Sequence, residues 1–131
     1  MVQGLWQIPV LFLSFEHFLG GQARLTSKLT PVLYERAMSK AAGTAEALYP
    51  IIPVKDPVLH SNVIGLLMVS TGSLLAYSKT RGSNVTLSLN TFLTLAGIYS
   101  QRRMRIPYYV PVFNLLLGAA VYYLERAREP L

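Results

Sequence analysis

Four long runs of apolar residues, separated by short polar segments, dominate the pattern along the chain. They cover residues 5–20, 58–77, 85–101 and 106–124, and each run carries very few charged side chains. At about 1.5 Å of rise per residue, each can cross a bilayer as a helix with some thinning of the membrane or snorkelling of its flanking side chains. The pattern therefore predicts an all-α protein: an integral membrane four-helix bundle that forms a single domain.

One segment between the first and second runs has a different pattern. Residues 31–48 carry apolar side chains at a helical period, and Thr30 followed by Pro31 is typical of a helix start, with Thr30 as N-cap. The segment also carries charged residues, so it is amphipathic, and we expect this first-loop helix to lie on or beside the membrane rather than across it. Three prolines between residues 50 and 57 then predict an extended segment.

The first apolar run has a second interpretation, a cleaved signal peptide. The small residues at positions 20–23 resemble a cleavage site. However, no basic segment precedes the run, and Glu16 and His17 interrupt it where a signal peptide is most apolar. We therefore expect a retained helix.

The composition agrees with a membrane protein. Only 14% of the residues are charged, compared with about 25% in soluble domains. The net charge is +6, but the 12 Lys and Arg residues flank the apolar runs, where lipid head groups are a better partner than nucleic acid. Their distribution places the first and third loops in the cytoplasm. Without cysteine, disulfides, thiolate metal sites and a cysteine nucleophile are excluded.

Polar residues collect at one face of the predicted bundle. Up-and-down threading brings the end of the first span, the start of the second, the end of the third and the start of the fourth together. The residues near these ends are Glu16, His17, Asp56, His60, Asn62, Tyr99, Gln101, Tyr108 and Tyr109. An ionisable group within a membrane costs roughly 2.5–3.5 kcal/mol on insertion scales, so such groups usually face a cavity, a partner or a pathway. The sequence therefore predicts a functional site here.

The residue types at this face suit acid and base chemistry. A carboxylate and an imidazole in an apolar pocket are the usual groups of general acid and base catalysis, and tyrosine hydroxyls can stabilise an oxyanion. The candidate catalytic residues are Glu16, His17, Asp56 and His60. The candidate substrate-binding residues are Trp6, Asn62, Tyr99, Gln101, Tyr108, Tyr109 and Asn114.

Each of these groups also has a structural interpretation. Glu16 can pair with Arg24 or with an arginine of the third loop and only anchor helix ends, and Asp56 lies in a proline-rich loop. The tyrosines suit anchoring at the membrane interface, and Asn90 and Asn114 suit hydrogen bonding between helices. The two histidines have no metal-binding spacing and no Gly-rich loop follows a strand, so the sequence predicts neither a metal nor another cofactor.

Several short motifs carry a resemblance to a known family. They are GQARLT at residues 21–26, Leu29 and Tyr34, LYP at residues 48–50, IGL at residues 64–66 and VSTG at residues 69–72. Together these resemble the DoxX-like membrane proteins, most closely the branch of NACHO-type receptor-assembly chaperones. The resemblance covers most of the chain in architecture. It implies a four-helix bundle in an internal membrane, with the endoplasmic reticulum as the expected location.

The chain departs from that family at two positions. Met68 stands where relatives often carry an acid in the second helix, and Ser100 stands where they carry a histidine near the end of the third. The family's activity is therefore not carried over to this chain. In size, number of spans and acidic or imidazole groups at a membrane cavity, the chain is also similar to small membrane proteins of fungal polyketide pathways, some of which open epoxides by hydrolysis or cyclisation.

The leading hypothesis is an enzyme that needs no cofactor and acts on a lipophilic polyketide or terpenoid intermediate taken from the bilayer. It opens an epoxide by acid and base catalysis. Glu16 or Asp56 activates the nucleophile, while His17, His60 or a tyrosine protonates the departing oxygen.

The alternative hypothesis is an assembly factor or chaperone that binds the transmembrane helices of a client. It predicts a functional face made by the small residues Gly65, Gly72 and Ser73. Small-residue faces of this kind also favour a homodimer. A third possibility, a subunit of a quinone-linked complex, is disfavoured because the sequence shows no ligand pair for haem or metal.

Overall fold

The computed structural model describes residues 2–128, with the side chains of residues 7–128. Within this range the chain forms five helices and no strand. The helices are α1 (Val2–Leu25), α2 (Pro31–Leu48), α3 (Pro57–Ala76), α4 (Asn84–Arg103) and α5 (Tyr109–Arg128). The prediction of an all-α fold is confirmed, and the first-loop helix covers the residues expected for it.

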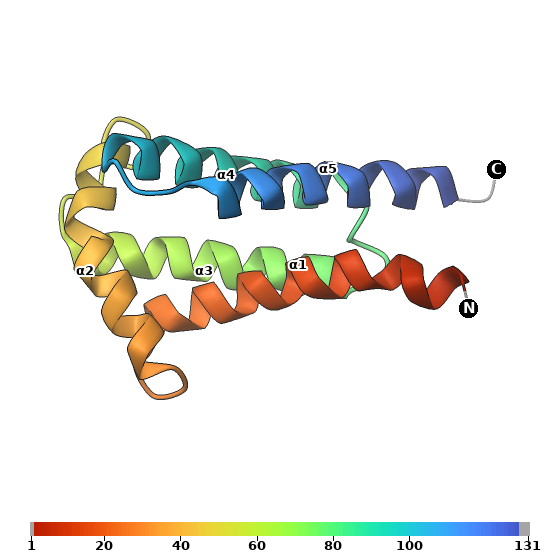
Figure 1. The fold of residues 1–131 in the computed structure, drawn as a ribbon, viewed down its shortest axis with the longest axis horizontal. Helices are drawn as coiled ribbons and strands as arrows, with labels where there is room; N and C mark the ends of the chain where they lie inside the picture. Colours follow the sequence, from red (N-terminus) through yellow and green to blue (C-terminus); the bar gives the residue numbers. More distant parts are fainter. Residues whose placement is uncertain (1, 129–131) are drawn as a thin grey trace.

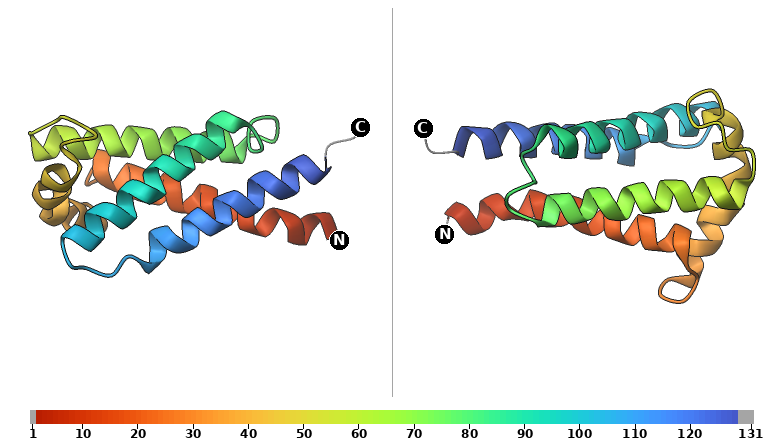
Figure 2. Two further views of the ribbon diagram at one scale, coloured as in Figure 1. Left: turned by 90° about the horizontal axis from the view of Figure 1, so that it is seen from above. Right: turned by 180° about the vertical axis from the view of Figure 1, so that it is seen from behind.

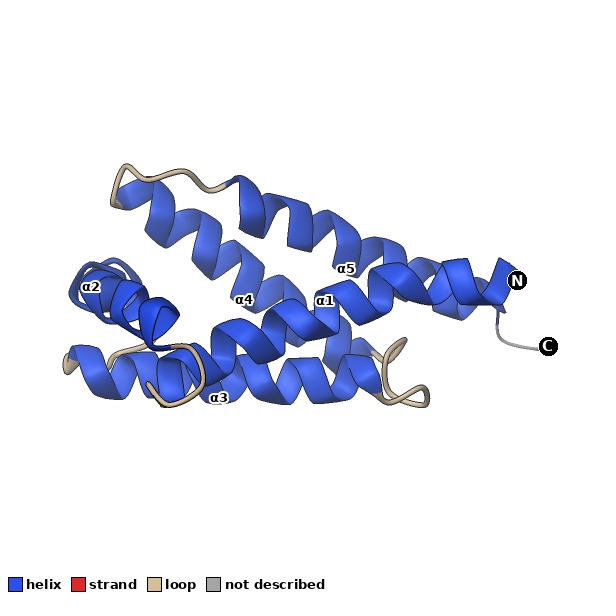
Figure 3. Ribbon diagram, turned by 60° about the horizontal axis from the view of Figure 1, so that its bottom comes forward, coloured by secondary structure: helices blue, strands red, loops and turns tan. Residues whose placement is uncertain are grey.

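Four helices run along the bundle and the fifth lies across its end. α1 and α3 form one layer, α4 and α5 form the other, and α2 crosses the ends of both layers (Figure 1). From behind, α2 lies at the end opposite to the start of α1 and the end of α5 (Figure 2). The loops lie only at the two ends of the bundle (Figure 3). The end of α1, the start of α3, the end of α4 and the start of α5 therefore meet beside α2.

Glycines bring α1 and α3 into backbone contact. A Cβ added at Gly65 would lie 2.9 Å from the Gly21 carbonyl oxygen, and one at Gly21 would lie 2.8 Å from the Gly65 carbonyl oxygen. Further along the pair, the Ser14 hydroxyl donates a hydrogen bond of 2.8 Å to the Gly72 carbonyl oxygen. The small residues of α3 therefore pack against α1 inside the chain.

The first turns of α3 and α2 differ in whether a side chain caps their free backbone N–H groups. The Asp56 carboxylate caps α3 by accepting hydrogen bonds from the backbone N–H groups of Val58 at 2.9 Å and Leu59 at 3.4 Å. The Thr30 side chain makes no capping hydrogen bond to α2, and its hydroxyl instead accepts one from the Gln22 amide at 2.7 Å. The predicted start of α2 is confirmed, whereas the capping role of the Thr30 side chain is wrong.

The fourth apolar run does not begin as a helix. Residues 104–108 form a turn and an extended segment, and α5 begins at Tyr109 rather than near residue 106. Two local causes act here. Arg105 has a positive φ of 59°, which ends the helical path, and Pro107 disfavours a helical conformation at Ile106.

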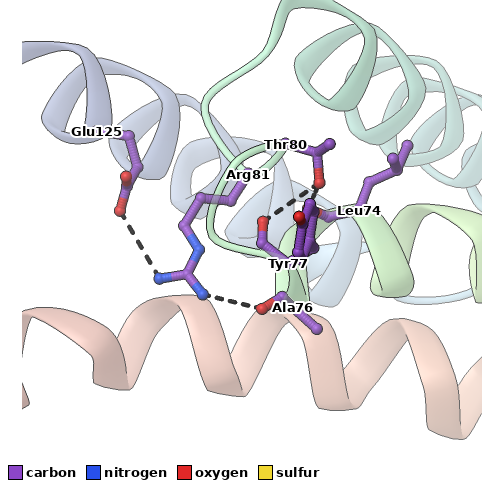
Figure 4. Close-up of polar contacts among 6 residues, drawn as sticks. All are labelled: Leu74, Ala76, Tyr77, Thr80, Arg81 and Glu125. Atoms are coloured by element: carbon purple, nitrogen blue, oxygen red, sulfur yellow. Dashed lines mark hydrogen bonds and ion pairs between the residues drawn. The ribbon is translucent and has the colours of Figure 1, made fainter. Parts of the chain in front are cut away.

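The turn between α3 and α4 is held by its own side chains (Figure 4). The Thr80 hydroxyl donates a hydrogen bond of 2.6 Å to the Leu74 carbonyl oxygen, and the Arg81 guanidinium donates one of 3.0 Å to the Ala76 carbonyl oxygen. Arg81 also lies 3.9 Å from the carboxylate of Glu125, so the turn is connected to the last turns of α5.

Apolar side chains are prominent on the outside of the bundle, and polar ones are common inside. Leu11 and Phe15 of α1 and Leu116 of α5 are 60%, 61% and 64% exposed. Phe12 and Phe113 also lie at this surface, where their rings pack edge to face at 6.0 Å. In contrast, the buried residues include His17, His60, Ser61, Thr71, Thr86, Asn90 and Thr94. In the part of the chain that is described, one helix, α3, is long and apolar enough to cross a membrane.

Candidate functional site

A cavity of about 440 Å³ lies where all five helices meet near α2. Its size is within the range of sites for small organic molecules. α1 and α3 supply its wall on one layer, the end of α4 and the start of α5 supply it on the other, and α2 closes the end. Most of the lining is apolar, with Leu19, Leu33, Ala41, Ile64, Leu93 and Val110 among the residues that contribute.

The cavity gathers part of the predicted site. Among the candidate catalytic residues, Glu16, His17 and His60 line it. Among the candidate substrate-binding residues, Gln101 and Asn114 line it. These residues come from α1, α3, α4 and α5, so the structure brings together polar groups that are far apart in the sequence.

The other predicted site residues lie elsewhere. Asp56 is exposed, acts as the N-cap of α3 and does not line the cavity, so the structure does not support a catalytic role for it there. Asn62 is partly buried but does not line the cavity. Tyr99, Tyr108 and Tyr109 are 43%, 41% and 73% exposed. None of the three lines the cavity, so the structure does not support a binding role there.

Trp6, another predicted binding residue, lies in α1, and its side chain is outside the part of the chain that the structure describes.

A chain of hydrogen bonds holds the His17 imidazole. The Asn90 amide nitrogen Nδ2 donates to the backbone carbonyl oxygen of Asn114 at 3.2 Å, and a carbonyl oxygen can only accept. The Asn90 oxygen Oδ1 therefore faces His17, whose Nε2 lies 2.8 Å away and must donate. In the neutral ring this places the proton on Nε2 and leaves the lone pair on Nδ1. Nδ1 is thus the ring nitrogen that keeps an unused lone pair.

The sequence predicted that Asn90 makes a hydrogen bond between helices, but it did not identify His17 as the partner. Its polar side chain in the middle of an apolar run was the available signal. A glycine on α5 makes room for it, because a Cβ at Gly118 would lie 2.9 Å from the Asn90 Cγ and closer still to Nδ2. Asn90 is 1% exposed and His17 is 3% exposed, so water does not compete for this bond.

Several polar atoms of the cavity residues have no protein partner. Glu16 Oε2, His17 Nδ1, His60 Nε2 and Asn114 Oδ1 are buried and make no hydrogen bond within the described part of the chain. The Asn114 side chain lies beside the Glu16 carboxylate and interacts with it. An unsatisfied buried polar group costs about 1–3 kcal/mol, so several in one cavity call for a functional explanation.

The pairing of Glu16 with an arginine, which was the structural alternative, is not seen. Among the described residues, no arginine or lysine nitrogen lies within 4.0 Å of the Glu16 carboxylate. The basic side chains of the cavity instead lie at its α2 side, where Arg24, Arg36 and Lys40 contribute to the wall. His, Asp and Glu side chains form no group of three or more that could hold a metal in the described range.

Compared with known proteins, the chain matches no family model, no curated protein and no solved structure. The resemblance to the DoxX-like family therefore stays a prediction. The fold and the site define an all-helical bundle with a largely apolar cavity whose lining includes a few buried polar side chains, and these side chains carry the information about function.

Proposed function

We propose that the chain is a membrane-embedded, cofactor-independent enzyme that opens an epoxide in a lipophilic polyketide or terpenoid intermediate by acid and base catalysis. The observation that carries this proposal is the cavity lined by Glu16, His17, His60 and Asn114, each with a buried polar atom that has no partner in the described part of the chain. Arrangements of this kind are favoured where a ligand or a reaction uses the unpaired atoms.

The distribution of side chains supports a bilayer as the solvent. The outer faces of α1 and α5 expose large apolar side chains such as Leu11, Phe15 and Leu116. A soluble monomer rarely exposes such a surface, whereas lipid accepts it without cost. The four long helices have 24, 20, 20 and 20 residues, which corresponds to at least ~30 Å each and matches the hydrocarbon core. The proposal includes four membrane spans, and it takes an internal membrane, such as the endoplasmic reticulum, from the family resemblance.

The proposed reaction begins when water or a hydroxyl group of the substrate attacks an epoxide carbon. Glu16 accepts the proton of that nucleophile as the new carbon–oxygen bond forms. The epoxide carbon–oxygen bond breaks, and the departing oxygen receives a proton from Nδ1 of the cationic His17, the histidine that follows Glu16 on α1. The proton on Glu16 then returns to the histidine, which restores the starting state. Asn90 keeps the His17 Nε2 proton in place, so that the exchange uses Nδ1.

The structure leaves less support for an assembly factor that binds client helices through the small residues of α3. Gly65 already contacts α1 through Gly21, and Gly72 contacts α1 through Ser14. Both glycines are therefore occupied within the chain. Ser73, the third residue of that face, is exposed, and the homodimer expected from it stays a prediction.

Turnover of lipophilic epoxides by the purified protein tests the proposal. The protein is incubated in detergent with a series of epoxides, and mass spectrometry separates a diol, which gains one water, from a cyclic ether, which gains none. Glu16→Gln and His17→Ala are expected to slow turnover roughly 100-fold or more, the usual contribution of a general acid or base. Asp56→Asn is the matched control, because asparagine is also a good N-cap. If the Glu16 and His17 variants both turn over like the parent, the assignment of roles is wrong.

A further inference from the structure

We propose that the cavity binds a lipophilic ligand with an anionic end, a carboxylate or a phosphate, and that Arg24, Arg36 and Lys40 hold this end. The inference rests on the proposed function, because the ligand it describes is the substrate of that site. It specifies that this lipophilic ligand carries a negative charge at one end and that this end points toward the basic residues.

The first argument is the charge of the cavity wall. Three cationic side chains line the cavity, and among the residues whose side chains are described Glu16 is the only acidic one in the lining. Within the described residues, no carboxylate lies within 4.0 Å of Arg24, Arg36 or Lys40. The charge of Arg24, which is partly buried beside apolar walls, attracts an anion most strongly because its surroundings screen it less than water does, and the exposed Arg36 and Lys40 add to the positive field at the cavity.

The second argument is the placement of the three cations. Arg36 and Lys40 are four residues apart on α2 and so lie on the same face of that helix, and both face the cavity. Arg24 is in the last turn of α1 and is partly buried. Arg36 and Lys40 therefore form a basic region on the α2 side of the cavity, and Arg24 adds a third cation to the cavity wall from α1.

The third argument is the state of the Arg24 guanidinium. Its Nη1 donates to the Gly20 carbonyl oxygen at 3.0 Å and lies 3.3 Å from the Met68 sulfur. A guanidinium has five N–H donors, and a neutral carbonyl and a thioether do not balance its charge. A carboxylate or phosphate would do so and can accept two parallel hydrogen bonds from it.

The geometry also gives the ligand a length. Glu16 and Arg24 lie on the same helix eight residues apart, which corresponds to ~12 Å along the helix axis. The wall between them includes Leu19, Gly20 and Ala23. Because Arg24 Nη1 reaches back to the Gly20 carbonyl oxygen at 3.0 Å, a ligand whose anionic end contacts it presents to Glu16 atoms that are within ~12 Å of that end. Epoxides within this distance of a carboxylate are the expected substrates.

Binding of a fluorescent fatty acid tests the inference without requiring turnover. The probe is 11-(dansylamino)undecanoic acid, and its methyl ester is the matched neutral probe. We expect the detergent-solubilised parent to bind the acid at least tenfold more tightly than the ester. Arg24→Gln is expected to remove this preference. Lys28→Gln, which removes the same charge from an exposed position outside the cavity, is expected to keep it.

A double variant, Arg36→Gln with Lys40→Gln, keeps the test informative if Arg24→Gln does not fold, because both residues are exposed on α2. It is also expected to reduce the preference. Equal binding of acid and ester by the parent would overturn the inference. So would a Lys28→Gln variant that loses as much preference as the cavity variants.

The source of the anion is decided by repeating the titration in bilayers. Displacement of the acid by phosphatidylglycerol but not by phosphatidylcholine, in the parent and not in Arg24→Gln, supports the site with a lipid phosphate as its source. No displacement by either lipid supports it with a free lipophilic acid. Selective acid binding without turnover of any epoxide would overturn the proposed enzyme and leave this site in place. Turnover of an epoxide together with equal binding of acid and ester would overturn the anion site and leave the proposed enzyme in place.

Discussion

Replacing Asn90 with leucine removes the group that orients the His17 imidazole while keeping a similar shape. Two hydrogen bonds disappear, the one to His17 Nε2 at 2.8 Å and the one to the Asn114 carbonyl oxygen at 3.2 Å. The first matters more, because His17 is 3% exposed and water cannot replace the lost acceptor. The Asn114 carbonyl oxygen, in contrast, can still accept from the backbone of its own helix.

The magnitude follows from the cost of an unpaired buried donor, about 1–3 kcal/mol. The free energy of unfolding is expected to fall by roughly this amount, and toward its lower end if the bundle lies in lipid, where such bonds contribute less. The imidazole can then rotate or place its proton on Nδ1. If the whole cost appears in the reaction barrier, turnover falls roughly 5- to 150-fold at about 1.4 kcal/mol per tenfold change.

Three measurements check this prediction. Denaturation by sodium dodecyl sulfate in mixed micelles, followed by circular dichroism, gives the change in stability. Epoxide turnover gives the change in rate. The ¹⁵N chemical shifts of the histidine ring show the tautomer, which is expected to be protonated at Nε2 in the parent and to lose that preference in Asn90→Leu. Thr71→Val is the control, because the Thr71 hydroxyl donates to the Leu67 carbonyl oxygen of its own helix and Thr71 does not line the cavity. A parent-like tautomer and rate in Asn90→Leu would refute the reasoning.

Further predictions concern the packing of the bundle and one helix cap. Gly118→Ala is expected to displace Asn90 and to reproduce the loss of the Nε2 tautomer in the ¹⁵N spectrum; an unchanged spectrum would contradict the close contact. Gly21→Ala is expected to lower the free energy of unfolding by about 1–3 kcal/mol in the same denaturation assay, because the new methyl group meets backbone atoms of α3. Gly43→Ala serves as its control, since the group it meets is the flexible Met104 side chain. Asp56→Ala is expected to lower stability by about 0.5–2 kcal/mol and to leave epoxide turnover unchanged, and a large loss of turnover would restore Asp56 to the site.

The helices could be predicted because their signals are local. Long apolar runs, the prolines at helix starts and the polar turns between runs each depend on neighbouring residues only. The start of α2 at Pro31 is a clear case. The start of α5 was missed because an apolar run does not distinguish helix from extended chain, and the positive φ at Arg105 was not visible in the sequence.

The site could be predicted only in part, for a physical reason. Threading places Glu16, His17 and His60 at one end of the bundle, and the cavity does contain them. The rotation of each helix about its axis decides which side chains face inward, and it depends on packing between distant segments. Asn90 therefore could not be matched with His17, 73 residues away. Tyr99 could not be assigned to the outer face of α4 for the same reason.

Lipid contact along the outer faces of α1 and α5 underlies the proposed function and can be measured directly. The chain has no cysteine, so Phe15→Cys and Leu116→Cys each introduce a single site for a spin label. In bilayers, both labels are expected to collide more often with oxygen than with a water-soluble nickel complex, while a label at Lys28→Cys in the loop shows the reverse. Labels at positions 15 and 116 that favour the nickel complex would contradict a bundle with lipid outside and a polar cavity within.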